Sequence, residues 1–322
     1  MLNELLKPIL SERWPDRSGL VIPPGRYFVT ETLVLDFLDL VDGNGVYYDS
    51  RGKGPFILAP GVTIVPAPTV DWTGKAVVEI CGSSTHITGI RVDARALPKP
   101  PAVGILLGGV KKRDGSGFSY HGGNSTFLNV ECMGLYTEAC VGLVNGEMVN
   151  LIGCDLNNEY QGGNGLLIAR GTSAPITPAS RITLEGFTQT QVTFRNGRIR
   201  TSGNGSAVRG ENYIGQITVT ENIITTDSGP VFTHTGSQAK QISIVRNRWE
   251  SWHGSYLSYF EKAPSNSSIE YNWLTRHGLL QPKFVCAVCP EDIKAVNIRF
   301  VGNEAWKGLV NTRKQVPTEA AR

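Results

Sequence analysis

The feature that most restricts the fold of this chain is an eleven-residue pattern that recurs every 25 residues. It reads QVTFRNGRIRT from Gln191, QITVTENIITT from Gln216 and QISIVRNRWES from Gln241. Self-similarity with a period of roughly 20 to 50 residues is typical of solenoids and other repeat architectures, in which each unit packs on its neighbours. The chain is therefore expected to build one stack of similar turns.

Within each copy the apolar residues lie at fixed offsets from the first one, which we number position 0. In one copy, positions 0, 2, 5 and 7 are Val192, Phe194, Gly197 and Ile199. A spacing of two is the period of a β-strand and not that of a helix. The phase changes at position 5, where Gly or Asn is frequent. We expect that residue to take the left-handed backbone conformation of a sharp bend between two strands.

The same template extends over most of the chain. Further copies begin at Thr85, Leu128, Val149, Ile217, Ile242, Ser267 and Ile298, and weaker matches begin at Val62 and Leu38. Asn222, Asn247 and Asn272 occupy position 5 in consecutive copies. Stacked turns would bring their side-chain amides together as a hydrogen-bonded ladder. Each copy also carries a second apolar stretch, which supplies another strand.

Short strands, sharp bends and a fixed step predict an all-β fold, a single-stranded right-handed parallel β-helix of about ten rungs. A β-sandwich is the competing fold, but it does not explain the 25-residue self-similarity. Because the end of such a coil exposes unpaired backbone groups, residues 1–17 are expected to form an N-terminal cap with a short helix. Residues 18–312 would form the coil, and residues 313–322 a polar C-terminal tail that leaves the rod.

Composition excludes several functional classes. The net charge of +3 is too small to argue for a nucleic-acid partner. No window offers 18 consecutive apolar residues, so no membrane insertion is expected. Of the six cysteines only Cys286 and Cys289 form a CxxC pair, without the second pair or the histidines of a zinc site. No acidic run has the pattern of a calcium cage, so neither a metal nor a cofactor is expected.

Two stretches carry a resemblance to known proteins. SGLVIPPGRYFVTETLVL (18–35), followed by LVDGNG (40–45), resembles the entry of the pectate-lyase-like superfamily, where two strands flank a Pro-Pro-Gly turn. DWTGKAVVEI (71–80) and SSTHITGIRVDA (83–94) resemble the β-helical tailspikes and tail fibres of bacteriophages. The resemblance implies an elongated, usually trimeric rod on a virion that contacts cell-surface polysaccharide. Some members cleave the polysaccharide, whereas others only bind or act as scaffolds, and the fold does not decide between them.

Candidate catalytic residues are carboxylates in the loops of adjacent turns. Glycoside hydrolysis needs two carboxyl groups, about 5 Å apart for retention and roughly 6.5–9.5 Å apart for inversion. Glu138 and Glu159 both lie ten residues past position 0 of their copies, and Asp155 is close in sequence. Repulsion between like charges there would keep one carboxyl group protonated. Solvated loop acids without a partner are the alternative interpretation.

Loops between the strands would line one flank of the rod, and functional residues concentrate on loops held by a rigid scaffold. The expected glycan-binding residues on this flank are Tyr160, Arg200, Asp227, Glu250, Trp252, His253 and Arg276. Exposed aromatic rings would stack on sugars, unless they pack against a neighbouring subunit or loop. The arginines would suit an acidic polysaccharide or an acidic partner surface, unless nearby acids balance them on a solvated face.

These observations predict a phage tailspike or tail-fibre protein that binds host cell-surface polysaccharide, with hydrolysis of that polysaccharide as an additional activity. It would be a homotrimer on the virion, exposed to the extracellular medium, in contact with other virion proteins. A non-catalytic structural virion protein, such as a decoration or fibre subunit, is the alternative from a different class. A free polysaccharide lyase or hydrolase is a second alternative.

Overall fold

The computed structural model describes residues 20–36, 56–81, 85–95, 97–108, 110–111, 118–120, 124–144, 147–169, 190–212, 215–236, 239–254, 256–276, 285–289, 298–305, 308–309 and 313–315. Within these ranges every regular element is a β-strand. The expected N-terminal cap, residues 1–17, lies outside the described residues. None of the described residues belongs to a helix long and apolar enough to cross a membrane.

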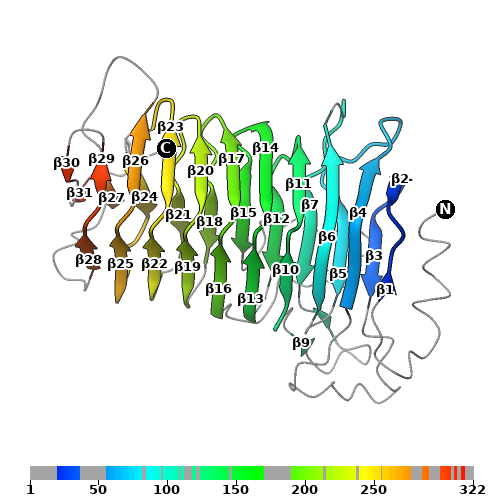
Figure 1. Ribbon diagram of the computed structural model, residues 1–322, viewed down its shortest axis with the longest axis horizontal. Helices are drawn as coiled ribbons and strands as arrows, with labels where there is room; N and C mark the ends of the chain where they lie inside the picture. Colours follow the sequence, from blue (N-terminus) through cyan, green and yellow to red (C-terminus); the bar gives the residue numbers. More distant parts are fainter. Residues whose placement is uncertain are drawn as a thin grey trace.

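The strands stack into an elongated coil with three faces, and equivalent strands of successive turns lie side by side (Figure 1). The first face contains β1 (Leu20–Val21), β4 (Phe56–Pro66), β6 (His86–Ala94), β10 (Thr126–Leu128), β13 (Glu147–Ile152), β16 (Thr190–Arg195), β19 (Ile217–Thr220), β22 (Ile242–Val245), β25 (Ser267–Glu270) and β28 (Ile298–Val301). The second face contains β2 (Gly25–Val29), the ends of β4 and β6, β11 (Glu131–Gly134), β14 (Asp155–Gln161), β17 (Arg198–Ser202), β20 (Ile223–Thr226), β23 (Arg248–Ser251), β26 (Trp273–Arg276) and β29 (Glu304–Ala305). The third face contains β3 (Leu33–Asp36), β5 (Ala76–Cys81), β7 (Val103–Gly108), β12 (Ala139–Val144), β15 (Asn164–Ala169), β18 (Val208–Glu211), β21 (Phe232–Thr235), β24 (Tyr256–Phe260), β27 (Val285–Cys289) and β31 (Arg313–Gln315).

Pairing along each face is parallel. β4 and β6 run through both the first and the second face, so these two faces form one 19-stranded sheet, and the third face is a 10-stranded sheet. Antiparallel pairs occur in the described chain between β8 (Val110–Lys111) and β9 (Phe118–Tyr120), and between β29 and β30 (Gly308–Leu309). β31 pairs with β27, so the third face continues past the expected boundary at residue 312.

The apolar positions of the repeat form the core of the coil. Phe194 pairs with Val219, and Val219 pairs with Ile244, so position 2 forms one inward row. Ile224 and Trp249 belong to the equivalent row at position 7. These side chains are at most 1% exposed. Burial of both rows confirms the predicted spacing, because apolar side chains removed from water supply most of the stabilising free energy.

The predicted asparagine ladder is present and extends one turn further. The Asn222 Nδ2 donates to the Asn247 Oδ1 over 3.0 Å, Asn247 donates likewise to Asn272 over 3.1 Å, and Asn272 to Asn303 over 2.9 Å. Each Oδ1 also accepts the backbone N–H of the preceding asparagine in the ladder. All of these side chains are at most 1% exposed. Successive turns are therefore joined inside the core by polar contacts as well as by the sheets.

The bend between the first and second faces differs from the prediction. The left-handed residue lies at position 4, where φ ranges from 51° to 76° at Gly89, Asn129, Gly153, Asn196, Glu221, Arg246, Tyr271 and Gly302. Position 5 follows the bend, and the side chain there already points into the coil. Asparagine is therefore favoured at position 5 by its buried hydrogen bonds, and not by its tolerance of a left-handed backbone.

The structure also corrects the start of two copies. Phe127 pairs with both Leu151 and Ile87, so this turn begins at Ser125 and not at Leu128. Val62 pairs with Ile90 directly after the bend, so it occupies position 5. The first error arises because the exposed Leu128 and the buried Val130 happen to have a spacing of two. The second arises because the inward pair after the bend, Val62 and Ile64, has the same spacing as the inward pair before it. The copy expected at Leu38 lies outside the described residues.

Candidate functional site

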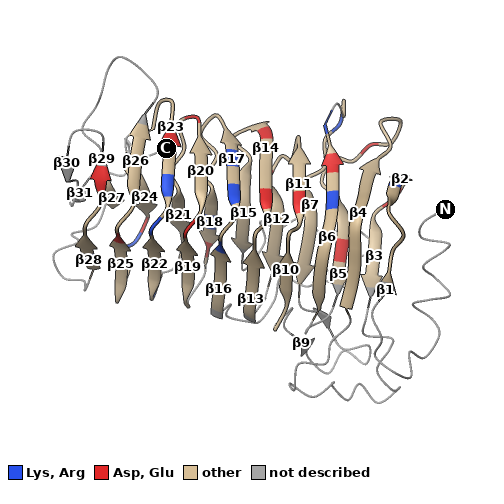
Figure 2. Ribbon diagram, in the orientation of Figure 1, with Lys and Arg blue, Asp and Glu red and all other residues tan. Residues whose placement is uncertain are grey.

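Outward-facing side chains of the second face form two rows, at positions 6 and 8 of the repeat. Position 6 carries Arg91, Glu131, Asp155, Arg198, Ile223, Arg248 and Trp273. Position 8 carries Asp93, Met133, Asn157, Arg200, Thr225, Glu250 and Thr275. Neighbouring strands lie about 4.8 Å apart, so each side chain contacts its equivalents in adjacent turns. Figure 2 shows bands of both charge signs across β6, β11, β14, β17 and β23.

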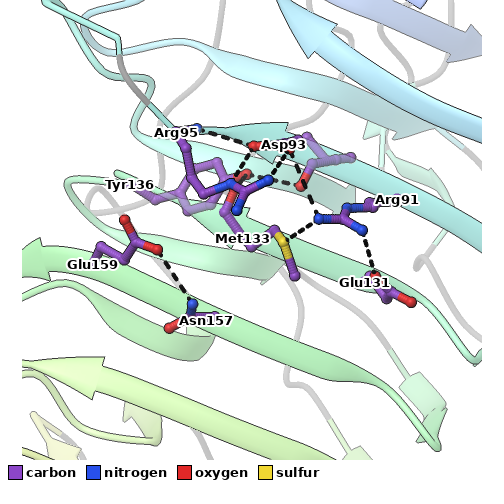
Figure 3. Close-up of polar contacts among 9 residues, drawn as sticks. Arg91, Asp93, Arg95, Glu131, Met133, Tyr136, Asn157 and Glu159 are labelled. Atoms are coloured by element: carbon purple, nitrogen blue, oxygen red, sulfur yellow. Dashed lines mark hydrogen bonds and ion pairs between the residues drawn. The ribbon is translucent and has the colours of Figure 1, made fainter. Parts of the chain in front are cut away.

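Near β6 the charges of this face are paired with one another (Figure 3). Arg95 binds both carboxylate oxygens of Asp93, at 2.6 and 2.9 Å, and Arg91 lies 3.5 Å from Glu131 and 3.9 Å from Asp93. The hydrogen bonds from Arg95 lower the pKa of Asp93, although burial opposes this shift. Beneath them the buried Tyr136 donates its hydroxyl to the Met133 carbonyl over 3.0 Å. This end of the face is a compensated structural network.

The three predicted catalytic carboxylates lie in different surroundings. Asp155 forms an ion pair with Arg198 at 3.6 Å. Glu159 is exposed and accepts a hydrogen bond from the Asn157 amide over 3.3 Å. Glu138 is half-buried directly before β12, and burial, aided by the nearby Glu211, raises its pKa. A raised pKa is what a general acid requires, but Glu138 lies at the start of the third face and not in β14.

Pairing also shows that Glu138 and Glu159 do not occupy matching positions. Gly134 aligns with Asn158, whereas Ala139 aligns with Asn164. The expected equal offset depends on the copy at Leu128, which begins three residues too late. The catalytic roles of Glu138, Asp155 and Glu159 stay predictions.

Four of the predicted glycan-binding residues line one pocket on the second face. Arg200, Asp227, Trp252 and His253 surround an open hollow of about 420 Å³. Trp252 is 50% exposed, so one large aromatic surface is available to a ligand. The other described lining residues are polar and uncharged: Asn157, Gln161, Thr201, Ser202, Thr225 and Thr226. An aromatic surface beside a few fixed polar groups is the usual composition of a site for a polar organic ligand.

The corner under this pocket is built from hydroxyl groups and glycines. Thr201 donates to the Gly205 carbonyl over 2.8 Å, and Thr226 donates to the Gly229 carbonyl over 2.6 Å. A Cβ on Gly229 would collide with the Gly205 carbonyl oxygen, so the stacked corners pack backbone against backbone. This packing requires glycine. The corner therefore holds the loop residues above it in fixed positions.

Asp227 and His253 are held by contacts between adjacent turns. The Asp227 carboxylate accepts the Gly203 N–H over 3.2 Å, and its other oxygen lies 3.7 Å from the His253 Nε2. The backbone N–H of His253 donates to the Asp227 carbonyl over 2.7 Å, and the Ser251 hydroxyl donates to the same carbonyl over 3.1 Å. The pocket wall is therefore preorganised, which lowers the entropy cost of binding.

The remaining predicted residues do not belong to the described lining of the pocket. Glu250 forms an ion pair with Arg248 at 2.6 Å, and Tyr160 is 37% exposed near the end of β14. Arg276 ends β26 and pairs with Ser251 through the backbone. Sequence reasoning missed Asn157 and Thr225, which flank Arg200 in the same row. Both lie eight residues after position 0 of their copies, as Arg200 does, and this shared offset is the sequence signal that would have placed them beside Arg200.

A second hollow, of about 410 Å³, lies on the first face. Its described lining includes Asn150, Thr193 and Thr218, and it contains no charged or aromatic side chain. It offers neither an ionic contact nor a surface for stacking. The second-face pocket is therefore the better candidate for a ligand site.

Comparison with known proteins supports the fold. The chain matches the surface protein and adhesin PfbA of Streptococcus pneumoniae with a TM-score of 0.55 and 11% identity, over 97% of this chain and 83% of that one. It matches the endo-xylogalacturonan hydrolase of Aspergillus tubingensis with a TM-score of 0.54 and 11% identity, over 98% and 95%. The chain is a right-handed parallel β-helix. The expected resemblance to pectate-lyase-like β-helices is thus confirmed for the fold.

Other comparisons add little to this result. A tailspike protein of E. coli bacteriophage HK620 matches 94% of this chain and 62% of its own, with 10% identity and a TM-score of 0.40. No family model and no curated protein sequence matches the chain.

Proposed function

We propose that this chain binds a cell-surface polysaccharide in the second-face pocket. The observation that carries the proposal is the grouping of the exposed Trp252 with Arg200, Asp227 and His253 on a rigid stack of strands. A sugar ring offers an apolar C–H face to an aromatic ring and hydroxyl groups to the polar side chains around it. The adhesin and hydrolase folds reported above are compatible with this use of the surface.

Binding without hydrolysis fits the pocket better than catalysis. A glycoside hydrolase needs two carboxyl groups beside the scissile bond. Asp227 is the one carboxylate among the described residues of the pocket lining. Hydrolysis by Glu138, Asp155 or Glu159 would occur outside this pocket. Release of new reducing ends by the wild type would contradict the binding-only proposal. Loss of that release in Glu138→Gln or Glu159→Gln but not in Asp227→Asn would assign the reaction to a site outside this pocket.

We further propose that the protein is a tailspike or tail fibre, present as a homotrimer on a virion. The resemblance of residues 71–94 to such proteins supports this assignment. Sedimentation equilibrium tests it, because the trimer has three times the chain mass of 34.9 kDa. A monomer at micromolar concentration would refute the trimer.

Affinity electrophoresis in gels that contain host-surface polysaccharides tests the binding proposal directly. Retardation of the wild type should be lost in Trp252→Ala, because removal of the indole removes the stacking surface. Trp273→Ala is the matched control, since Trp273 is 43% exposed on the adjacent strand β26 and does not belong to the pocket lining. Equal loss in both variants, or retention in Trp252→Ala, would refute the pocket as the binding site.

A further inference from the structure

Arg200 differs in its charge pairing from Arg91, Arg198 and Arg248 on the same face. Arg91 pairs with Glu131 at 3.5 Å, Arg198 with Asp155 at 3.6 Å, and Arg248 with Glu250 at 2.6 Å. The exposed Arg200 forms no ion pair with any residue that the structure describes. It is also the one arginine among these four that lines the pocket.

The row that contains Arg200 explains why its charge stays uncompensated. Its neighbours at position 8 are Asn157 on β14 and Thr225 on β20, both uncharged. The next residue along the row is Glu250, which Arg248 already binds. Asp155 lies nearby at position 6, but it binds Arg198. A guanidinium group flanked by neutral hydrogen-bonding side chains is a site for an anionic group of a ligand.

Asp227 does not occupy this site. It belongs to the adjacent turn and lies beyond the end of β20, with its N–H bonded to the Thr201 carbonyl at 3.2 Å. One oxygen of its carboxylate accepts the Gly203 N–H, and the other lies 3.7 Å from the His253 Nε2. Arg200, Asp227 and Trp252 therefore come from three successive turns, and the Trp252 N–H donates to the Thr226 carbonyl over 3.2 Å. A ligand with an anionic group at one end and hydroxyl groups at the other matches this arrangement.

We propose that the pocket selects a polysaccharide with a carboxylate-bearing sugar, whose carboxylate forms a bidentate pair with Arg200. The neighbouring sugar ring lies on Trp252, and its hydroxyl groups donate to Asp227. Asn157 and Thr225 supply neutral hydrogen bonds beside the carboxylate. This inference rests on the proposed function and names the substrate class of the same site.

Matched polymers test the inference with the full chain. Affinity electrophoresis is run with polygalacturonate, alginate and hyaluronan, and with the same polymers after reduction of their carboxyl groups to hydroxymethyl groups. The wild type should bind at least one acidic polymer about 10- to 100-fold more tightly than its reduced form, as expected for a charge-assisted hydrogen-bonded pair. Sulfated dextran separates carboxylate recognition from general attraction to anions, and equal binding to it would overturn the carboxylate assignment.

Variants assign the effect to one side chain. Arg200→Gln should lose the preference for the acidic polymer and bind the reduced polymer as the wild type does, and Arg200→Lys should retain only part of the preference. Arg195→Gln is the matched control, because Arg195 is an exposed arginine on β16 outside the pocket lining. Equal losses in Arg195→Gln and Arg200→Gln would overturn the inference.

The inference and the proposed function can fail separately. Wild-type binding to neutral or reduced polymers that requires Trp252 but shows no preference for carboxylates would overturn the inference alone. Absence of binding to every acidic, reduced and neutral polymer would overturn both.

Discussion

Removal of one ladder asparagine tests how the turns are held together. The Asn247 Oδ1 accepts the Asn222 N–H over 3.1 Å and the Asn222 Nδ2 over 3.0 Å, and its own Nδ2 donates to the Val219 carbonyl over 2.8 Å. In Asn247→Ala all of these contacts are lost. Asn247 is 1% exposed, so water has no direct access to the groups left behind.

The magnitude follows from the groups that lose their partner. The Asn222 N–H and one Asn222 amide proton become unpaired, while the other amide proton keeps its contact with the Phe194 carbonyl at 3.1 Å. A buried donor without a partner costs about 1–3 kcal/mol. The two donors together should therefore lower the free energy of unfolding by about 2–6 kcal/mol.

Urea denaturation followed by tryptophan fluorescence measures this change as a shift of the midpoint at constant slope. Asn150→Ala is the matched control, because Asn150 is a half-buried asparagine that lies outside the core on the first face. We expect the control to change stability by less than about 0.5 kcal/mol. Equal stability of Asn247→Ala and Asn150→Ala would refute the claim that the ladder stabilises the coil.

Three further predictions concern the corner glycines and the shifted carboxyl groups. Gly229→Ala should lower the Tm strongly, since its Cβ would collide with the Gly205 carbonyl oxygen, whereas Gly25→Ala, which has space, should not; equal Tm values would contradict the steric argument. The raised pKa of Glu138 means that ionisation disfavours the folded state, so Glu138→Gln should gain stability at pH 7 and none at pH 3, as measured by urea midpoints. Asp93 has a lowered pKa, so its contribution is present above the ordinary carboxyl range and disappears as pH falls through the folded value. Asp93→Asn should therefore lose stability at pH 7 and match the wild type in strong acid, and a constant difference between the two proteins across pH would contradict the linkage.

The inward positions of the fold could be predicted from sequence, because burial imposes a strict apolar spacing on every turn. Phe194, Val219 and Ile244 repeat at one offset, and the asparagine ladder repeats with them. The bend was harder to place, because Glu221, Arg246 and Tyr271 take a left-handed backbone without belonging to the residue types that prefer it. Tertiary pairing on both sides imposes this conformation, and composition alone does not reveal it.

The candidate site was predictable only in part. Trp252, His253, Asp227 and Arg200 could be grouped because the loops of successive turns must lie side by side. Which arginine has an ion-pair partner could not be predicted. Arg198 and Arg200 lie on the same strand, and only their neighbours on the adjacent strand distinguish them. One has Asp155 beside it and the other has Asn157. This difference of partner depends on the register between turns, which a single sequence leaves open by a few residues.

The asparagine ladder has a consequence for how the length of the rod can change. In the ladder each side-chain amide donates to the equivalent amide of the next turn, always in the same direction along the axis. Removal or duplication of a complete repeat unit would keep the ladder asparagines next to one another, whereas a partial unit would bring a different residue to that position. Insertions and deletions that the fold tolerates should thus contain whole repeat units. The distance between the two ends of the rod should then change in equal steps.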